Sequence, residues 1–393
     1  MTNTYHPGVD MKLFEYEAKA FLQKSGIPVP KSKVCGTEDE AASAYTEFGG
    51  NAVLKAQVLA GGRGKAGGIK FPRSEDEARS QAKDILAMKI KGEAVEKVLV
   101  EEKQNIKREH YLGIVTDPDA GCPLLMFCAE GGMDIEELSS KNPDAVKKTL
   151  IDPRYGLFGY QVQELLKGSD IPKDAQTGIV SIARALYQTY WDKDGELIEI
   201  NPLVETAEGK VVAADAKFNI DNSALYRQPD MPKRPVRTVE ERAEKLGLSY
   251  ISLDGNIGII SNGAGLTMSA MDYLNQEGAK PANFLDLGGQ ATQSSGIKNG
   301  IGLVLEKPDV TALLIYIFAG GPRCDVIATG IVEAINEMEK EHSLRVPIVV
   351  TLHGRFAEEG MKVLSTCKSP RLYQEPMVED AVRKVIELGG KAQ

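Results

Sequence analysis

Residues 196–204 read Glu-Leu-Ile-Glu-Ile-Asn-Pro-Leu-Val, and after a polar turn residues 211–217 read Val-Val-Ala-Ala-Asp-Ala-Lys. Apolar and polar residues alternate on both sides of the turn at Glu208–Gly209. This period of two predicts a pair of strands with one buried face and one polar face. The glycine-containing turn between them is typical of a β-hairpin.

Folding this hairpin about position 208 places Asn201 opposite Asp215. It also places Glu199 opposite Lys217, and the Cβ atoms of such pairs lie about 5 Å apart. An amide oxygen and a carboxylate this close can bind Mg²⁺, which takes few protein oxygens and completes its shell with water and phosphates. For one Asn and one Asp, a solvated hairpin face is the simpler interpretation. Pro202 favours a site, because it lacks a ladder donor and predicts an interrupted or edge strand beside these oxygens.

Composition is that of an ordinary soluble globular protein with two or three domains. The chain has 393 residues, of which 42% are hydrophobic and 26% charged. Its net charge of −9 and pI near 5.3 argue against a general nucleic-acid binder. The five cysteines and four histidines show no zinc spacing or disulfide framework, which fits a reducing compartment. No apolar run is long enough to cross a bilayer, so we expect no membrane partner. The acidic net charge likewise predicts no nucleic-acid partner.

The polar residues at the start of the chain and a proline-rich stretch near its middle predict the domain boundaries. Residues 1–10 are polar and do not resemble a secretory signal, so we expect a cytoplasmic protein of bacterial or archaeal type. A processed form in the mitochondrial matrix stays open if the source is eukaryotic. Residues 228–237 are rich in proline and charge, which predicts a linker. We therefore expect one domain over residues 11–238 and a second over residues 239–393.

A lysine and a glycine-rich stretch follow one another in the first domain. Residues 52–58 predict a strand with Lys55 inside it, either extending to solvent at a sheet edge or directed at a ligand. In residues 60–70, glycines surround Arg63 and Lys65. Glycines let a backbone approach phosphate closely and the cations supply counter-charge, so we expect a phosphate cradle rather than a flexible surface loop. The stretch matches neither the P-loop nor the GxGxxG pattern.

Further elements of this half predict a two-lobed α+β nucleotide-binding domain. Residues 11–25 and 174–190 have helical periodicity. Residues 97–101 predict a strand that ends in an acidic residue. Purine bases commonly dock beside a strand with exposed backbone groups, so residues 101–104 are a candidate base edge.

The second half repeats a strand, a glycine turn and a helix four times. The predicted strands are residues 257–261, 282–286, 312–318 and 346–352. Continuous apolar strands alternating with helices predict a doubly wound parallel sheet of the α/β class. Such sheets bind ligands at the carboxyl ends of their strands, near helix N-termini that favour anions. Here those ends hold Asn262, residues 320–322 and His353.

Seven motifs together resemble the β subunit of succinate–CoA ligase (succinyl-CoA synthetase) from about Met11 to the C-terminus. They are Leu13-Phe-Glu-Tyr-Glu-Ala-Lys19, Gly61-Gly-Arg-Gly-Lys-Ala-Gly-Gly68, Glu199-Ile-Asn-Pro-Leu203, Leu253-Asp-Gly-Asn-Ile-Gly258, Asn262-Gly-Ala-Gly265, Pro281-Ala-Asn-Phe-Leu-Asp286 and Arg323-Cys-Asp325. The resemblance implies an ATP-grasp domain followed by a flavodoxin-like CoA-ligase domain. It also implies an acid–thiol ligase of the tricarboxylic acid cycle. Its α subunit would carry the CoA site and a phosphohistidine, in an αβ or (αβ)₂ assembly.

The resemblance also implies roles for individual residues. Those implied to bind the nucleotide are Lys55, Gly62, Arg63, Gly64, Glu101, Gln104 and Glu109. Magnesium falls on Asn201 and Asp215, and Glu199 is the implied catalytic residue that positions the phosphohistidine. Those implied to bind the carboxylate substrate are Asn262, Gly320, Gly321 and Pro322. Pro30 stands where ATP-preferring members have proline, which favours ATP over GTP.

Two stretches depart from the family pattern, and both follow strands at the expected acid site. Residues 320–322 read Gly-Gly-Pro, where the family has Gly-Ile-Val or a close variant. Residues 351–356 read Thr-Leu-His-Gly-Arg-Phe, where it has Arg-Leu-x-Gly-Thr/Asn-Asn. Malate–CoA and citrate–CoA ligases are built on the same plan, so the acid stays open among succinate, malate and citrate.

The histidines bear on where the phosphoryl group is carried. No Gly-His-Ala-Gly loop occurs, so the phosphohistidine is expected on the partner and this chain alone is expected to be inactive. Among His6, His110, His342 and His353, only His353 lies at a predicted ligand-facing turn, as a candidate substrate contact. Two other classes stay open: an ATP-grasp carboxylate–amine ligase, and a scaffolding subunit with a vestigial nucleotide site.

Overall fold

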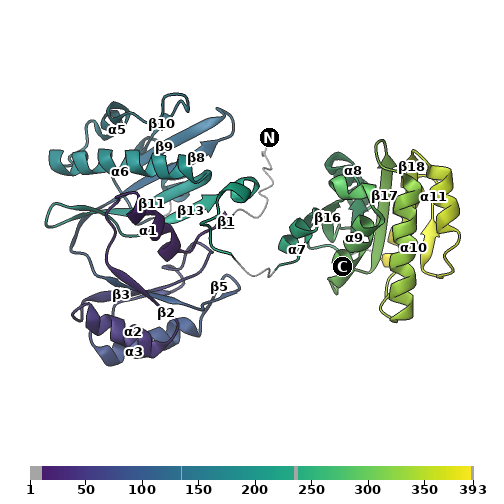
Figure 1. Cartoon of the computed structure of the whole chain (residues 1–393), viewed down its shortest axis with the longest axis horizontal. Coiled ribbons are helices and arrows are strands. Elements are labelled where there is room, and N and C mark those ends of the chain that lie inside the picture. Colours follow the sequence, from purple (N-terminus) through teal and green to yellow (C-terminus); the bar gives the residue numbers. More distant parts are fainter. Residues whose placement is uncertain (1–10, 134, 234–237, 391–393) are drawn as a thin grey trace. The chain divides into compact units, whose positions relative to one another are not determined.

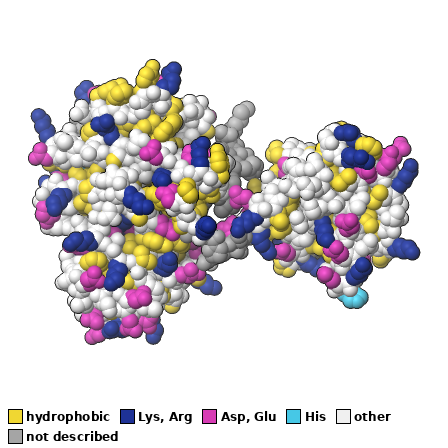
Figure 2. All heavy atoms as spheres, in the orientation of Figure 1, with side chains coloured by type: hydrophobic (Ala, Val, Ile, Leu, Met, Phe, Trp, Pro, Cys, Tyr) yellow, Lys and Arg dark blue, Asp and Glu magenta, His cyan; other side chains and the backbone are white. Residues whose placement is uncertain are grey.

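The computed structural model describes residues 11–133, 135–233 and 238–390, and the chain forms two compact units (Figure 1). We call them unit 1 (Met1–Pro232) and unit 2 (Lys233–Gln393). His6 and the end of the proline-rich stretch lie outside the described residues. Among the residues described, no helix is long and apolar enough to cross a membrane. Positive and negative side chains are interspersed over the visible face of each unit (Figure 2).

Unit 1 contains a large antiparallel sheet with strand order β1-β13-β11-β8-β9-β10, and β12 pairs with β11. The strands are β1 (Met11–Lys12), β8 (Ile106–Asp117), β9 (Cys122–Cys128), β10 (Val146–Leu150), β11 (Gly195–Thr206), β12 (Val211–Ala213) and β13 (Lys217–Ile220). The helices of this lobe are α1 (Glu15–Lys24), α4 (Ile135–Lys141), α5 (Gly159–Leu166) and α6 (Lys173–Asp192). Helices α1, α5 and α6 share one hydrophobic core with the sheet, in which Leu22, Ile179 and Ile198 are fully buried.

The central hairpin of this sheet has the predicted register. Glu199 pairs with Lys217, and the same alignment continues where β11 pairs with β12. Asn201 therefore lies across from Asp215, between the two ladders. Strand β11 is an inner strand, and its pairing with β8 is interrupted at Pro202. Of the two predicted options for this proline, the interruption is right and the edge strand is wrong.

The chain start differs from the expected helix over residues 11–25. Met11 and Lys12 pair with β13, and the backbone N–H of Leu13 continues the pairing by donating to Phe218 at 3.0 Å. Helix α1 begins only at Glu15. The apolar spacing of these first residues also suits an edge strand, and the open backbone groups of β13 decide between the two.

The smaller sheet of unit 1 has strand order β2-β7-β3-β4 and is covered by two helices. Its elements are β2 (Ser32–Cys35), α2 (Glu38–Glu47), β3 (Ala52–Ala56), β4 (Ile69–Lys70), α3 (Glu75–Leu86) and β7 (Val98–Glu102), with a separate hairpin of β5 (Lys89–Ile90) and β6 (Glu93–Ala94). Thr37 and Ser74 cap the two helices with their side-chain oxygens. Strand β3 is an inner strand and Lys55 is buried, so a lysine extending to solvent from a sheet edge is the wrong interpretation.

Unit 2 is the expected doubly wound sheet, with order β14-β16-β15-β17-β18-β19 and only β14 antiparallel to its neighbour. Its strands are β14 (Ser249–Ser252), β15 (Ile257–Ser261), β16 (Asn283–Asp286), β17 (Ala312–Ala319), β18 (Ile348–Gly354) and β19 (Leu372–Gln374). Its helices are α7 (Val239–Lys245), α8 (Ala264–Gln276), α9 (Ser294–Glu306), α10 (Cys324–Lys340), α11 (Ala357–Leu364) and α12 (Val378–Gly389). Helices α9 and α10 contribute to one hydrophobic core and α8 and α12 to another, so both faces of the sheet are covered.

Candidate functional site

Six ionisable side chains meet where the glycine-rich loop, α1 and the two sheets of unit 1 come together. We call these residues the ionic cluster: Glu15, Lys19, Lys55, Arg63, Glu101 and Asp215. Three are cations and three are anions, so the cluster is balanced in charge. Its members are nearly all buried, and Asp215 marks its open end with a side chain 31% exposed.

The two lysines share their partners. Lys55 Nζ lies 2.6 Å from a Glu101 oxygen and 3.1 Å from a Glu15 oxygen. Lys19 pairs with the same two carboxylates, and both ammonium groups donate to the Ala214 carbonyl at 2.7 Å. Buried charges are tolerated only when they are paired and hydrogen-bonded, so this arrangement holds the two lobes of unit 1 in one geometry.

Arg63 connects the buried part of the cluster to its open end. One guanidinium nitrogen lies 2.6 Å from Glu15 Oε2, and another lies 2.7 Å from Asp215 Oδ2. A polyphosphate entering here would compete with both carboxylates for the guanidinium, whose fork geometry suits phosphate as well as carboxylate.

Pairing within the cluster shifts the pKa values of Glu15 and Lys55 in the directions that favour their charged forms. Burial by itself raises the pKa of the Glu15 carboxyl, but the three neighbouring cations, Arg63 foremost, hold that pKa well below its usual value. Burial lowers the pKa of the Lys55 ammonium, but Glu15 and Glu101 outweigh burial and raise it above its usual value. Glu15 and Lys55 therefore act as fixed charges rather than as a titrating acid and base.

The glycine-rich loop joins β3 to β4 as a tight turn beside the cluster. The backbone N–H of Gly68 donates to the Arg63 carbonyl at 2.8 Å, and the Gly68 carbonyl accepts from Ala56 at 2.7 Å. Gly62 has φ +90°, a conformation that glycine adopts without strain. With Gly64, it leaves the backbone on either side of Arg63 without side chains, which would let a phosphate approach closely.

Asn201 and Asp215 face each other at the open end of the cluster. The Asn201 amide accepts from the backbone of Gly132 and donates to that of Met133, both at 2.8 Å, and so holds the loop after β9. Asp215 accepts from Arg63 and, at 2.7 Å, from the backbone N–H of the following residue.

These oxygens fit a magnesium ion with few protein ligands. The Asn201 carbonyl oxygen keeps a second lone pair, and the half-buried Asp215 carboxylate stays accessible from solvent. In the parts of the chain that the structure describes, no three His, Cys, Asp or Glu side chains gather as a metal site. Most of the shell would therefore come from water and phosphate oxygens, as magnesium prefers.

Two glycines allow the loop after β9 to lie directly on β8. A Cβ atom on Gly131 would fall 2.3 Å from the His110 carbonyl oxygen, and one on Gly132 would fall 2.2 Å from the Glu109 carboxylate. The backbone N–H of Gly131 donates to the Glu109 carbonyl at 2.9 Å. The loop thereby brings the Glu109 carboxylate close to the backbone that Asn201 holds.

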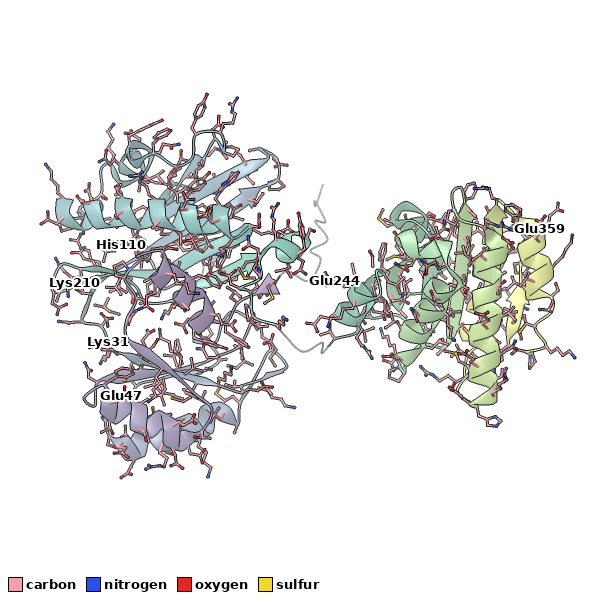
Figure 3. The ribbon with its side chains drawn as sticks, viewed as in Figure 1. Lys31, Glu47, His110, Lys210, Glu244 and Glu359 are labelled. Atoms are coloured by element: carbon pink, nitrogen blue, oxygen red, sulfur yellow. The ribbon has the colours of Figure 1, made fainter. Side chains whose placement is uncertain are left out.

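Glu199, Gln104 and His110, which the sequence analysis also names in unit 1, make separate contacts outside the ionic cluster. Tyr111 donates to the Glu199 carboxylate at 3.3 Å. Gln104 lies just past β7 and donates to the Glu102 carbonyl at 3.1 Å. His110 is buried within the large sheet, where its Nδ1 lies 2.9 Å from the Ala129 carbonyl (Figure 3).

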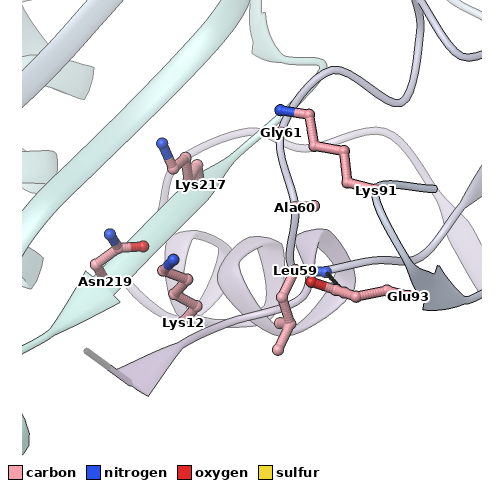
Figure 4. A pocket seen from close by; sticks show the side chains of 8 residues that line it. All are labelled: Lys12, Leu59, Ala60, Gly61, Lys91, Glu93, Lys217 and Asn219. Atoms are coloured by element: carbon pink, nitrogen blue, oxygen red, sulfur yellow. Dashed lines mark hydrogen bonds between the residues drawn. The ribbon is translucent and has the colours of Figure 1, made fainter. Parts of the chain in front are cut away.

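A cationic pocket of about 330 Å³ extends the site along β13 (Figure 4). Lys12 and Lys217 line it from the large sheet, and Lys91 lines it from the β5–β6 turn. Gly61, at the start of the glycine-rich loop, forms part of its wall. Lys217 lies two residues beyond Asp215 in the sequence, and the three lysines against one glutamate, Glu93, make this pocket favourable for anions.

In unit 2, the predicted acid-binding residues lie at the carboxyl edge of the sheet. Asn262 follows β15, and residues 320–322 follow β17. The Asn262 side chain accepts from the Phe318 N–H and donates to the Phe318 carbonyl, both at 2.9 Å, and so ties the two strand ends together. His353 pairs with Phe318 across β17 and β18, and Thr351 Oγ1 lies 3.2 Å from its Nε2.

Two domain families match the chain in the order that the fold shows. The ATP-grasp domain matches residues 12–205, and CoA-ligase matches residues 260–369. The β subunit of ADP-forming succinate–CoA ligase from Nautilia profundicola is 41% identical, over 96% of this chain and 98% of that protein. The same subunit from Halorubrum lacusprofundi is 40% identical over the same shares. The chain belongs to the succinate–CoA ligase β-subunit family.

Membership in the succinate–CoA ligase β-subunit family confirms the predicted resemblance, the acid–thiol ligase class and the ATP-grasp and CoA-ligase domains. The solved structure of ATP citrate lyase from Methanothrix soehngenii is similar to this chain with a TM-score of 0.75. It covers 96% of this chain and 100% of its own, but at 19% identity it shows a shared fold alone. The roles of individual residues in this family member stay predictions.

The candidate site of this succinate–CoA ligase β-subunit relative includes residues that sequence reasoning missed. Glu15 and Lys19 lie four residues apart in α1, a spacing that usually marks an exposed helix pair. Gln57 donates to Glu15 at 3.2 Å and is also buried. The sequence signal that points to these residues is the motif at residues 13–19, which contributes to the family resemblance.

Proposed function

We propose that this chain is the nucleotide-binding β subunit of a succinate–CoA ligase. With an α subunit it converts succinate, CoA and ATP into succinyl-CoA, ADP and phosphate. The observation that supports this is the charge-balanced ionic cluster beside a glycine-rich loop, with the Asn201–Asp215 pair at its open end. Residues 11–238 would form the nucleotide domain and residues 239–393 the acid domain.

The nucleotide phosphates would bind over the glycine-rich loop. Phosphoryl transfer depends on positioning and on neutralising charge more than on covalent help from the protein. Arg63 and Lys55 supply that positive charge, and Gly62 and Gly64 let the phosphates approach the backbone. The remaining residues assigned to the nucleotide are Glu101, Gln104 and Glu109.

Asn201 and Asp215 would hold magnesium, which when bound neutralises charge on the phosphates. Without these ligands, the Asp215 carboxylate is neutralised by its ion pair with the Arg63 guanidinium. On nucleotide binding, Arg63 would turn from the carboxylates to a phosphate oxygen, and Asp215 would be released. The exchange keeps the charges of the cluster compensated in both states.

The γ-phosphoryl group of the bound nucleotide would then be transferred to the α subunit. In the synthetic direction, the γ-phosphoryl passes from ATP to a histidine of the α subunit, positioned with the help of Glu199. It passes next to a carboxylate oxygen of the acid, giving an acyl phosphate. The CoA thiolate attacks the acyl carbon and phosphate departs, which completes the thioester. Because the histidine and CoA site belong to the partner, the chain alone would be inactive.

The test is thioester formation by this chain co-expressed with a candidate α subunit from the same source. The assay supplies CoA, magnesium with ATP or GTP, and succinate, malate, citrate or itaconate in turn, and uses the β chain alone as a control. We expect succinyl-CoA with ATP only when both subunits are present. Amide formation without CoA would instead support a carboxylate–amine ligase, and failure to bind magnesium–nucleotide would support a scaffolding subunit.

A malate–CoA or citrate–CoA ligase is the second candidate, because residues 320–322 and 351–356 depart from the family pattern at the acid edge of unit 2. Turnover of malate or citrate well above succinate would favour it. A cytoplasmic location and an αβ or (αβ)₂ assembly complete the proposal. Size-exclusion chromatography with light scattering on the co-expressed complex decides between the two assemblies.

A further inference from the structure

One buried histidine of unit 1 lies beside the candidate nucleotide residues and has no part in the proposed chemistry. His110 is 1% exposed and stands in β8 between Glu109 and Tyr111 (Figure 3). Successive side chains of a strand point to opposite faces, so His110 points away from the face on which Tyr111 reaches Glu199. Any effect of this imidazole on a ligand must therefore act through the backbone.

The imidazole of His110 binds the chain where the chain leaves β9. Its Nδ1 lies 2.9 Å from the carbonyl oxygen of Ala129, the first residue after that strand. A carbonyl oxygen only accepts, so Nδ1 carries the hydrogen and donates it. Burial lowers the pKa of the ring, which favours the neutral form, and in that form Nε2 carries no hydrogen. The bond to Ala129 therefore selects one tautomer.

The packing around the ring does not by itself require a histidine. The ring centre lies 5.9 Å from that of Phe127, and His110 pairs with Leu203 across β8 and β11. Leu112 lies two residues further along the same face and is fully buried. A leucine at position 110 would suit these neighbours and would bury no ring nitrogen, whereas Nε2 of His110 has no partner within the described residues.

The segment that this bond holds, residues 129–133, also contacts the candidate nucleotide and metal residues. The backbone N–H of Gly131 donates to the Glu109 carbonyl at 2.9 Å. The Asn201 amide binds the backbone of the next two residues, both at 2.8 Å. Because two glycines let the segment pack directly on β8, a shift at Ala129 would be passed on to Asn201.

Removal of the imidazole would loosen this segment without unfolding the sheet. Ala129 is exposed, so water can replace the imidazole at its carbonyl. The segment would then lose its tie to the buried face of β8 and sample more conformations as it leaves β9. A ligand that requires one of these conformations binds more weakly when the others are populated.

We propose that His110 is a positioning residue of the nucleotide site. Its Nδ1–H fixes the Ala129 carbonyl, and through residues 129–133 it fixes the Asn201 amide and the backbone beside Glu109 for nucleotide binding. It does not contact the nucleotide and takes no part in phosphoryl transfer. This inference rests on the proposed function, since it concerns the nucleotide assigned to this site.

Three substitutions of His110 separate its hydrogen-bond donor from its volume. His110→Asn keeps a donor near the position of Nδ1, His110→Gln moves the donor to the position of Nε2, and His110→Leu removes it. In the co-expressed αβ complex, we expect His110→Leu and His110→Gln to raise KM for ATP about tenfold, as for loss of one hydrogen bond, and His110→Asn to stay within about threefold of wild type. For all three, kcat and KM for succinate should change less than about threefold.

The matched control is Leu112→Met, which changes the same buried face and removes no hydrogen bond. We expect its KM for ATP to stay within about twofold of wild type. Chemical denaturation should show His110→Leu to be no less stable than wild type, so that unfolding does not account for weaker nucleotide binding. Calorimetric titration of magnesium–ADP into the same complexes should give the same order of affinities without turnover.

The imidazole nitrogen chemical shifts of the full chain, labelled in histidine, report the tautomer. The His110 signals, identified by their loss in His110→Asn, should show hydrogen on Nδ1 and none on Nε2. Hydrogen on Nε2 alone, unchanged magnesium–ADP affinity in His110→Leu, or a loss in His110→Asn or Leu112→Met as large as in His110→Leu would overturn the inference. Absence of thioester with every acid, while His110-dependent nucleotide binding persists, would overturn the proposed function alone.

Discussion

The two candidate sites of this chain handle charge in opposite ways. In unit 1, three cations and three anions neutralise one another in a largely buried cluster, and Lys55 has carboxylates on two sides. In unit 2, Arg323 is neutralised but Arg355 stands exposed with no paired carboxylate among the described residues. The charges of the unit 1 cluster are thus compensated within the protein, whereas the exposed guanidinium of Arg355 has no carboxylate partner among the described residues.

This difference matches the two tasks of an acid–CoA ligase. Every member must bind the same nucleotide phosphates, and a buried network with many mutual partners tolerates little change. The acid differs among related enzymes, and the residues predicted to bind it lie on turns after β17 and β18. A turn residue such as Arg355 can be replaced without leaving a buried charge unpaired.

Of the changes considered, the substitution Lys55→Met is expected to reduce stability and activity most. Loss of this ammonium leaves Glu101 buried with one fewer partner, so we expect unit 1 to lose about 3–5 kcal/mol of stability and activity to fall on the order of a thousandfold. Chemical denaturation followed by fluorescence of Trp191, the one tryptophan in the sequence, reports unit 1. The double variant Lys55→Met with Glu101→Gln should regain stability but not activity. Normal activity in either variant would contradict a phosphate-binding role for Lys55.

Asp215→Asn tests the open end of the same cluster. We expect kcat to fall on the order of 100-fold and the magnesium requirement to rise, since the carboxylate would no longer help neutralise the metal. Stability should change by less than about 1 kcal/mol, because this carboxylate is partly exposed. The matched control is Asp230→Asn, which removes only a surface pair with Lys193 at 2.8 Å. An unchanged magnesium titration would remove Asp215 from the metal site.

Gly131→Ala against Gly302→Ala separates a packed glycine of unit 1 from an open one of unit 2. The first would place a Cβ atom against the His110 carbonyl and displace the loop that Asn201 holds, so we expect about 1–3 kcal/mol of destabilisation and a KM for ATP raised about tenfold. Gly302 lies within α9 with nothing near its Cβ position, so alanine there should stabilise by up to about 1 kcal/mol. Equal stability of the two variants would show that the loop adapts.

The smallest expected effect is the loss of unfolding free energy of unit 1 at acid pH. The pKa of Glu15 lies below its usual value in the folded chain, so its contribution to stability is present above about pH 4.5 and is lost as pH falls through its folded pKa. We expect the unfolding free energy of unit 1, measured through Trp191, to decline below pH 4.5 by up to about 1.4 kcal/mol per pH unit from this group. Glu15→Gln should lack that part of the decline. Identical acid profiles for the two proteins would contradict the pairing.

Much of the fold could be predicted because its signals are local. The alternation around residues 196–217 predicted the hairpin register, and continuous apolar runs predicted the parallel sheet of unit 2. Helix α3 was missed, since its buried face is made mostly of small residues such as Ala78 and Ala82, which give little periodicity. The start of α1 was misplaced because the open edge of β13 competes for the first residues of the chain.

Residues in an unusual sequence context could be recognised as candidate site residues, whereas residues in an ordinary context could not. Arg63 among glycines and Asn201 before a proline were recognisable. Glu15 and Lys19 look like a surface helix pair, yet both are buried. Arg355 stands in a stretch that departs from the family pattern, and only the structure shows that it makes no ion pair with a described carboxylate, unlike Arg323.

The sequence by itself determined the four main parallel strands of unit 2, how the central hairpin aligns and which family the chain resembles, because these follow from spacing within a few tens of residues. Only the tertiary structure decided which charges meet: Lys55 and Glu101 are 46 positions apart, and Arg63 and Asp215 are 152 apart. The energy of an ion pair depends on the distance between its atoms and on their burial. Neither the distance nor the burial can be derived from the spacing of residues along the chain.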